Sequence, residues 1–173
     1  MTVTARLLTQ PWYVSECARF TRRDSGGGMT PELFARYLAS EHSPIRVLMF
    51  QVDMTGIPYP VSVHFTRHKV GVEHFVTTSR PDLTGKPRSI DDTVNHRMVC
   101  NAQALITMAR RRLCSNAADE TRQVMLAVRP AVGAVFVEEG LGAAMKAAMV
   151  PDCEYRGGYC HEFKTCGLYP RKA

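Results

Sequence analysis

Three consecutive residues after a β-rich segment have side chains that can bind an anion. Arg67, His68 and Lys69 stand next to each other, and Gly71 follows two positions later. Because the preceding run is predicted to be a strand, cationic side chains and free backbone amides should converge where it ends. A solvated basic strand end is the purely structural interpretation of the same residues. The motif by itself leaves both interpretations open.

A second set of polar residues lies on a helix that is predicted to begin near Cys100. At about 100° per residue, Arg112 shares a stripe with the apolar Leu105 and Met108. A guanidinium in such a stripe must reach an anion or a carbonyl group, because it is not buried unpaired. A snorkelling or salt-bridged arginine is the structural alternative. The helix is polar on two sides, with Asn101 and Arg112 on one side and Gln103, Thr107 and Arg110 on the other.

Length and composition are those of one globular domain spanning residues 1–173, with 45% hydrophobic residues and a cysteine-rich tail at 151–173. Neither a roughly 18-residue apolar span nor an export signal is recognisable, so we expect a soluble cytoplasmic protein. The net charge of +6 favours an anionic partner. Basic residues are dispersed except at 110–112 and 171–172, which favours phosphorylated small molecules over nucleic acid or a membrane.

The six cysteines are expected to be reduced thiols, because nothing in the sequence indicates an oxidising compartment. No metal is therefore expected. Zinc is the alternative, since Cys153, Cys160 and Cys166 lie close in sequence and Cys100 or Cys114 offers a further thiolate. These three lack the tight spacing of a strong zinc motif.

The helices and strands that position these residues can be predicted in part from the sequence. A loop at 24–28 should precede a helix capped by Thr30, with Pro31 at its first position. Residues 47–54 and 59–66 are predicted strands joined by a tight connection at 55–58. A surface loop is expected at 81–97, followed by a helix over 98–112. Ser115 and Asn116 can cap the next helix, whose first turn holds Asp119 and Glu120. Pro130 and Gly140 should divide the helical sequence that continues to Pro151, and 153–167 should be irregular.

Four segments resemble, in order, landmarks of the flavin-dependent thymidylate synthases. Residues 42–46 (HSPIR) are similar to the family's His-x-Ser-Pro-x-Glu, with arginine in place of glutamate. Residues 64–69 (HFTRHK) resemble Gln-x-x-Arg-His-Arg, which opens the family signature. The end of that signature matches 77–80 (TTSR) only with one inserted residue, and its Asn-Glu pair is missing. Residues 101–112 resemble the family's Asn-x-Arg-x-x-x-Asn/His helix with its later arginine. Residues 117–122 resemble Ala-x-x-Glu-Ile-Arg, and the two segments stand at the family's spacing.

The resemblance implies a short, divergent member with an α+β fold, in which a small antiparallel or mixed sheet packs with helices. It implies C5 methylation of a pyrimidine deoxynucleotide monophosphate, dUMP to dTMP. FAD would be the cofactor, and methylenetetrahydrofolate and NADPH the co-substrates. Family members are homotetramers whose active sites are shared between subunits, and no cysteine nucleophile is needed.

The resemblance also assigns roles to residues. Arg112 would be catalytic, facing the uracil carbonyl and stabilising enolate character in the ring, a task for which lysine is a poor substitute. The implied substrate-binding residues are His64, Arg67, Thr78, Ser79, Arg80 and Arg112. The implied cofactor-binding residues are Ser43, Arg67, His68, Lys69, Asn101, Gln103 and Thr107.

Two alternatives remain. His64 stands where the family has a pocket glutamine, and its different donors and acceptors leave room for dCMP as substrate or for transfer of a hydroxymethyl group. An alternative of another class is a zinc-stabilised nucleic-acid-binding module, which the charge and the cysteine tail favour. The sequence lacks the interleaved aromatic residues and basic runs of such modules, so no nucleic acid or membrane partner is expected.

Overall fold

The computed structural model describes residues 1–24 and 27–171. The predicted loop at 24–28 and the basic pair at 171–172 lie partly outside these ranges. The strands are β1 (Thr2–Leu7), β2 (Met49–Pro58), β3 (Val72–Val76) and β4 (Thr93–Asn101). The helices are α1 (Pro11–Arg22), α2 (Pro31–Ala39), the 3-10 turn η1 (Ser43–Val47), α3 (Tyr59–Thr66), α4 (Pro81–Thr84), α5 (Ala102–Arg112), α6 (Asp119–Gly133), α7 (Glu139–Ala148) and α8 (Asp152–Tyr155).

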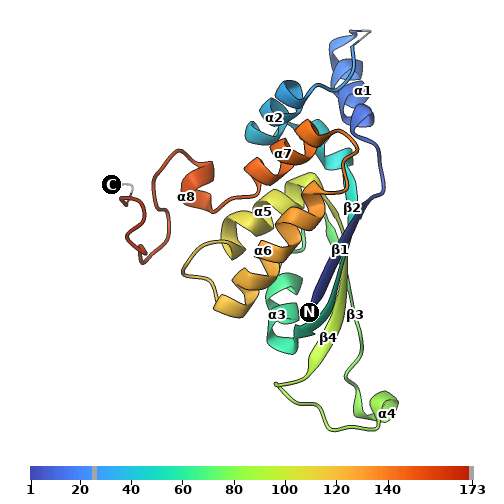
Figure 1. Ribbon diagram of the computed structural model, residues 1–173, viewed down its shortest axis with the longest axis vertical. Coiled ribbons are helices and arrows are strands. Elements are labelled where there is room, and N and C mark those ends of the chain that lie inside the picture. Colours follow the sequence, from blue (N-terminus) through green and yellow to red (C-terminus); the bar gives the residue numbers. More distant parts are fainter. Residues whose placement is uncertain (25–26, 172–173) are drawn as a thin grey trace.

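The four strands form one antiparallel sheet in the order β1-β2-β4-β3. Helices α3, α5 and α6 pack on one face of this sheet, and the tail beyond α8 loops away from them (Figure 1). Side chains alternate along β4, so that Val94, His96, Met98 and Cys100 are buried under the helices. The α+β fold with a small antiparallel sheet is confirmed.

The opposite face of the sheet is polar. Arg6 donates to Gln51 at 2.7 Å, Gln51 donates to Asp53 at 2.8 Å, and Arg97 forms two bonds to Asp53 at 2.7 and 3.0 Å. A one-sided apolar pattern is what an antiparallel sheet with a single packed face requires. The sheet therefore contributes one apolar face to the core.

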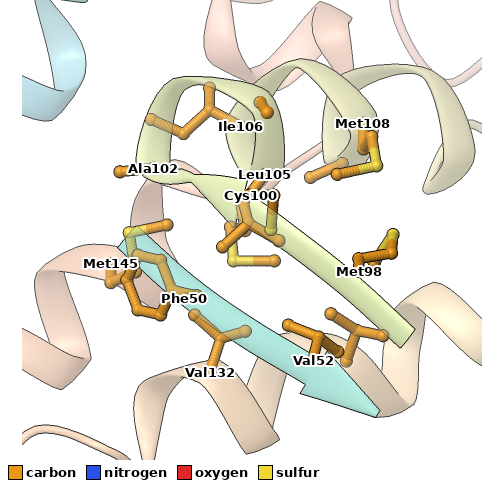
Figure 2. Packing of buried hydrophobic residues seen from close by; sticks show 14 of the residues in the cluster. Phe50, Val52, Met98, Cys100, Ala102, Leu105, Ile106, Met108, Val132 and Met145 are labelled. Atoms are coloured by element: carbon orange, nitrogen blue, oxygen red, sulfur yellow. The ribbon is translucent and has the colours of Figure 1, made fainter. Parts of the chain in front are cut away.

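The core lies between the sheet and the helices. Phe50 and Val52 of β2 meet Leu105 and Met108 of α5, and Met145 of α7 closes the far end (Figure 2). All five are fully buried. Burial of each such side chain stabilises the fold by roughly 1.5–3 kcal/mol. This packing fixes α5, which carries the residues that could do chemistry.

The first of the two predicted strands is confirmed, but the connection predicted at 55–58 belongs to that same strand and the second predicted strand is wrong. The strand predicted at 47–54 extends to Pro58 as β2, whereas 59–66 is the helix α3. Pro60 near the start of α3 suits a helix N-terminus, and Val61 and Phe65, four positions apart, are buried against the sheet. Burial at helical spacing outweighed the β-preference of the valines. Arg67 to Lys69 consequently follow a helix.

The loop at 81–97 and the helix over 98–112 also need correction. Residues 93–101 are strand β4, and α5 begins only at Ala102. The alternating burial of β4 is the pattern of a half-buried strand, and its central position between β2 and β3 supplies hydrogen bonds on both edges. A short helical turn, α4, interrupts the remaining loop.

Helix ends were predicted well where a local signal is strong. Thr30 caps α2 by accepting from the Leu33 N–H at 3.2 Å, as predicted. Asp119 and Glu120 do occupy the first turn of α6, but Ser115 and Asn116 do not cap it. Pro130 and Gly140 lie inside α6 and α7 and divide neither, because the break falls at 134–138.

Residues beyond α8 form turns and bends with one isolated bridge, between Cys160 and Arg171. The predicted irregular segment is thus confirmed apart from the single turn of α8. Within the described ranges, no helix is long and apolar enough to cross a membrane.

Candidate functional site

Arg112, the last residue of α5, is fixed against the end of α3. Its Nε donates to Nε2 of His68 at 3.0 Å, and its Nη2 donates to the carbonyl oxygen of His64 at 2.8 Å. The prediction that this guanidinium must reach an anion or a carbonyl group is confirmed for the carbonyl. A guanidinium has five N–H groups. Two are used, so the remaining ones can bind a ligand.

The surroundings of Arg112 are cationic. Among the described residues, neither Arg67 nor Arg112 forms an ion pair with a carboxylate. Burial, together with the charges of Arg67 and Arg111, lowers the pKa of Arg112 below its ordinary value. Positive charge that the protein leaves uncompensated favours binding of an anion or an electron-rich carbonyl oxygen.

His68 is neutral at pH 7 and accepts a hydrogen bond from Arg112. Burial and the nearby charge of Arg112 lower the pKa of His68 to about 4. Since its Nε2 accepts from Arg112, its proton is assigned to Nδ1. His64 also has a pKa below its usual value, owing to burial and to Arg112, and its Nδ1 lies 2.7 Å from Thr121 Oγ1. The His68 ring and the His64 backbone carbonyl thus hold the arginine without adding charge.

Two histidines of the sheet, His74 and His96, support the segment that contains His68. His74 on β3 contacts the carbonyl oxygen of His68 through Nε2 at 2.7 Å, and its Nδ1 lies 2.9 Å from Nε2 of His96 on β4. Burial lowers the pKa of His96 to about 4. The chain of contacts runs from the sheet to the residue that accepts from Arg112. Our sequence analysis missed both histidines, although His96 stands in the alternating buried pattern of β4.

Asn101 has a structural task. Its Oδ1 accepts from the Ala104 N–H at 2.9 Å and caps α5, and its backbone N–H donates to the Gly71 carbonyl at 2.9 Å. Gly71 has φ +72°, and a Cβ there would come within 2.6 Å of the Asn101 side chain. Glycine at 71 is therefore required both by the backbone and by the close approach of Asn101.

The second polar side of α5 is tied to the connection between α2 and η1 and to α8. Gln103 Nε2 donates to Glu41 at 2.7 Å, and Arg110 bridges Glu41 and Asp152, each at 2.6 Å. Gln103 Oε1 is buried and has no hydrogen-bond partner among the residues that the structure describes. Thr107 Oγ1 bonds back to the Gln103 carbonyl oxygen. Contacts within the chain thus explain this polar side.

Residues 78–80 lie past the end of β3, where the chain turns into α4 at the end of the sheet away from the start of α5 (Figure 1). Arg80 pairs with Asp82 at 2.6 Å and is largely exposed. The Arg80 N–H donates to Thr78 Oγ1 at 3.2 Å. Within the described parts of the chain, no hydrogen bond joins this segment to Arg112, His64 or His68.

Apart from Asn101, which caps α5, the predicted site residues fall into three groups within one chain. The first surrounds Arg112 at the ends of α3 and α5, and it contains His64, Arg67, His68, Lys69 and Arg112. The second follows the other side of α5 beside η1, and it contains Ser43, Gln103 and Thr107. The third is Thr78, Ser79 and Arg80. Hydrogen bonds join Arg112 to His68 and to the His64 carbonyl, and within the described residues none joins it to the second or third group.

The fold resembles those of known enzymes. No family model matches the chain, and no curated protein matches its sequence. Solved structures do match. Thymidylate synthase X from Helicobacter pylori with FAD and dUMP has a TM-score of 0.67 at 12% identity, covering 85% of this chain and 99% of that one. A second structure of the flavin-dependent enzyme from Helicobacter pylori, complexed with FAD and dUMP, gives 0.63 at 16% identity over 76% and 93% of the two chains.

A UMP/dUMP methylase from Streptomyces cacaoi bound with 5-Br dUMP has a TM-score of 0.61 at 14% identity, covering 86% of this chain and 97% of that one. At these identities the likeness establishes a common fold. The chain thus has the fold of the flavin-dependent thymidylate synthases.

Proposed function

We propose that this chain methylates C5 of a pyrimidine deoxynucleotide, dUMP to dTMP, with FAD as cofactor and methylenetetrahydrofolate and NADPH as co-substrates. The observation that carries the proposal is the guanidinium of Arg112, held by His68 and the His64 carbonyl with N–H groups to spare and no carboxylate partner among the described residues. The structural neighbours, which bind FAD and dUMP or 5-Br dUMP, support the same ligand classes.

Arg112 is proposed to donate to a carbonyl oxygen of the pyrimidine. Electron density drawn toward that oxygen gives the ring enolate character and makes C5 nucleophilic. His68 keeps the guanidinium plane in place, and as a neutral acceptor it leaves the full positive charge of Arg112 for the substrate. His64 is proposed to border the nucleotide, and Thr78, Ser79 and Arg80 to hold its phosphate through hydroxyl groups and charge.

The donors in the chain fit FAD. Arg67 and Lys69 are exposed cations suited to the pyrophosphate, and His68 is an uncharged ring suited to the flavin edge. The buried Gln103 Oε1 needs a donor, which an N–H group of a ligand would provide. Ser43, Asn101 and Thr107 complete the proposed cofactor-binding set. Bound FAD would supply the hydride chemistry that turns the transferred one-carbon unit into a methyl group.

FAD binding tests the proposal. Titration of FAD into the apo-protein should quench flavin fluorescence, and Arg67→Gln should weaken the affinity roughly tenfold or more, because a charge-assisted hydrogen bond contributes about 1.5–3 kcal/mol. Arg22→Gln, which removes an exposed cation on α1, should leave the affinity unchanged. Absence of binding at high micromolar FAD would contradict the function. The mass of the product formed from dUMP or dCMP then identifies the substrate and distinguishes methyl from hydroxymethyl.

A homotetramer is part of the proposal, because one chain holds its three groups of site residues apart. The 78–80 segment of one subunit would complete the site around Arg112 of another. Mixing an Arg80→Ala variant with an Arg112→Lys variant should therefore restore part of the activity that each lacks. Sedimentation of a fully active monomer would rule this arrangement out.

A further inference from the structure

Four of the six cysteines line one cavity of about 270 Å³, although they come from separate parts of the chain. Cys114 follows α5, Cys153 lies in α8, and Cys160 and Cys166 belong to the tail. All four are free thiols. Leu113, Leu126 and Leu168 are among the other residues that line it. Cys17 and Cys100 lie elsewhere and provide an internal comparison.

The part of the tail beyond α8 has little else to hold it. Cys160 is its one buried apolar residue within the described range, whereas Phe163 and Leu168 are 93% and 65% exposed. Its links to the body are the Glu162 ion pair with Arg111 and a bond from Asn116 to the Lys164 carbonyl. Ordering a segment of this length is entropically costly, so a segment without a core needs another source of stability.

We propose that Cys114, Cys153, Cys160 and Cys166 bind one Zn²⁺ as a tetrahedral four-thiolate site that fastens the tail to α5 and α8. Each thiol releases a proton to solvent, and four Zn–S bonds of about 2.3 Å form without any change of oxidation state. Among the described residues, no three His, Cys, Asp or Glu side chains already converge on a metal position. Zinc binding therefore draws the thiols inward and contracts the cavity.

Other ligands fit this cavity less well. Its rim carries Arg110, Arg122 and Arg129 together with Asp152, Glu154 and Glu162, so the formal charges cancel and favour neither an anion nor a cation. Disulfides would join the thiols only in pairs, whereas zinc uses all four at once. Soft thiolate ligands in tetrahedral number select zinc among the common divalent metals. The site is independent of the proposed function, although Cys114 also borders a second cavity, which Arg112 lines.

Metal analysis of the full-length chain purified under reducing conditions tests the proposal. We expect about one tightly bound zinc per chain, and a Co²⁺-substituted sample should show the absorption of tetrahedral thiolate-bound cobalt. Cys166→Ser and Cys114→Ser should lose the zinc, whereas the matched Cys17→Ser variant should retain it. Iron with acid-labile sulfide, a disulfide between these residues, or a chain that stays metal-free in excess zinc would overturn the inference.

The wild-type chain provides a readout that does not depend on variants folding. With zinc bound, a thiol reagent should modify Cys17 and leave the four site cysteines unreacted. Removing the metal with a chelator should make Cys114, Cys153 and Cys166 reactive and lower the melting temperature, because binding stabilises the ordered tail. Reactivity that does not change with chelator would contradict a zinc site. Neither measurement involves flavin or nucleotide, so failure of the proposed function leaves the result interpretable.

Discussion

Arg112→Lys is expected to slow flavin oxidation by nucleotide and folate about 10²-fold or more, while FAD affinity stays near that of the wild type. Two N–H groups of the arginine are held by His68 and by the His64 carbonyl, so its plane is fixed and its other N–H groups remain available. A lysine ends in a single nitrogen on a flexible stem. It can replace the charge but cannot hold two protein acceptors and present a rigid fork to a pyrimidine carbonyl.

Three measurements on the same sample separate chemistry from stability. These are single-turnover flavin oxidation, FAD affinity and melting temperature. Arg111→Lys is the matched control, since Arg111 is exposed and pairs outward with Glu162. Its rate should stay near that of the wild type. A purely structural role for Arg112 predicts a lower melting temperature with near-normal turnover, and that result would move the catalytic assignment away from Arg112.

The pH dependence gives a further check on the support that His68 provides. Its pKa of about 4 means that it remains a neutral acceptor for Arg112 throughout the range above pH 6. The folded-state pKa is below the unfolded value, so the stability contributed by neutral His68 is complete above about pH 6.5 and is lost as the pH falls toward 4. Titration of His68 should not appear in an activity profile between pH 7 and 8.

Sequence reasoning succeeded where the determining signal is local. The cap at Thr30 and the acidic first turn of α6 depend on neighbouring residues, so a short window contains all the information. It failed where tertiary packing decides. The valines of α3 favour a strand, but the sheet buries Val61 and Phe65 at helical spacing. Pro130 lies inside α6 because burial of Val128 and Val132 outweighs the lost hydrogen bond.

The candidate site shows the same division. Periodicity placed Arg112 beside the apolar Leu105 and Met108 and required an acceptor for it, and the structure provides one. The identity of that acceptor depends on how α3 packs against α5, which no local pattern contains. The bridge from Arg110 to Glu41 and Asp152 joins residues 69 and 42 positions apart in sequence. Contacts of this range follow from the fold and cannot be derived before it.

That bridge leads to the second large expected effect. Arg110→Met should lower the free energy of unfolding by about 3 kcal/mol or more, because it leaves Asp152 and Glu41 without their buried partner. The side chains of Arg110 and Asp152 are only 12% and 10% exposed, so water cannot replace the lost interaction. The guanidinium also lies 4.9 Å from the ring centre of Tyr155, a contact that methionine cannot reproduce as a cation.

Arg97→Met is the matched control for this effect, since it removes an equally well-aligned pair with Asp53 on the open face of the sheet. Arg97 is 53% exposed there, so the expected loss is below about 1 kcal/mol. Urea unfolding of both variants at pH 7 gives the comparison.

The ionisation of Asp152 makes this effect depend on pH. Burial opposes ionisation of Asp152, but hydrogen bonds from Arg110 and Arg156 outweigh burial and lower the pKa of Asp152. The stability gained from that carboxylate is present above about pH 4 and is lost as the pH falls through the lowered pKa. Without Arg110, burial dominates and Asp152 takes up a proton more readily, so the gap between wild type and Arg110→Met should narrow as the pH is lowered. Equal losses for the two variants at pH 7 would show that the bridge at Arg110 behaves like a surface ion pair.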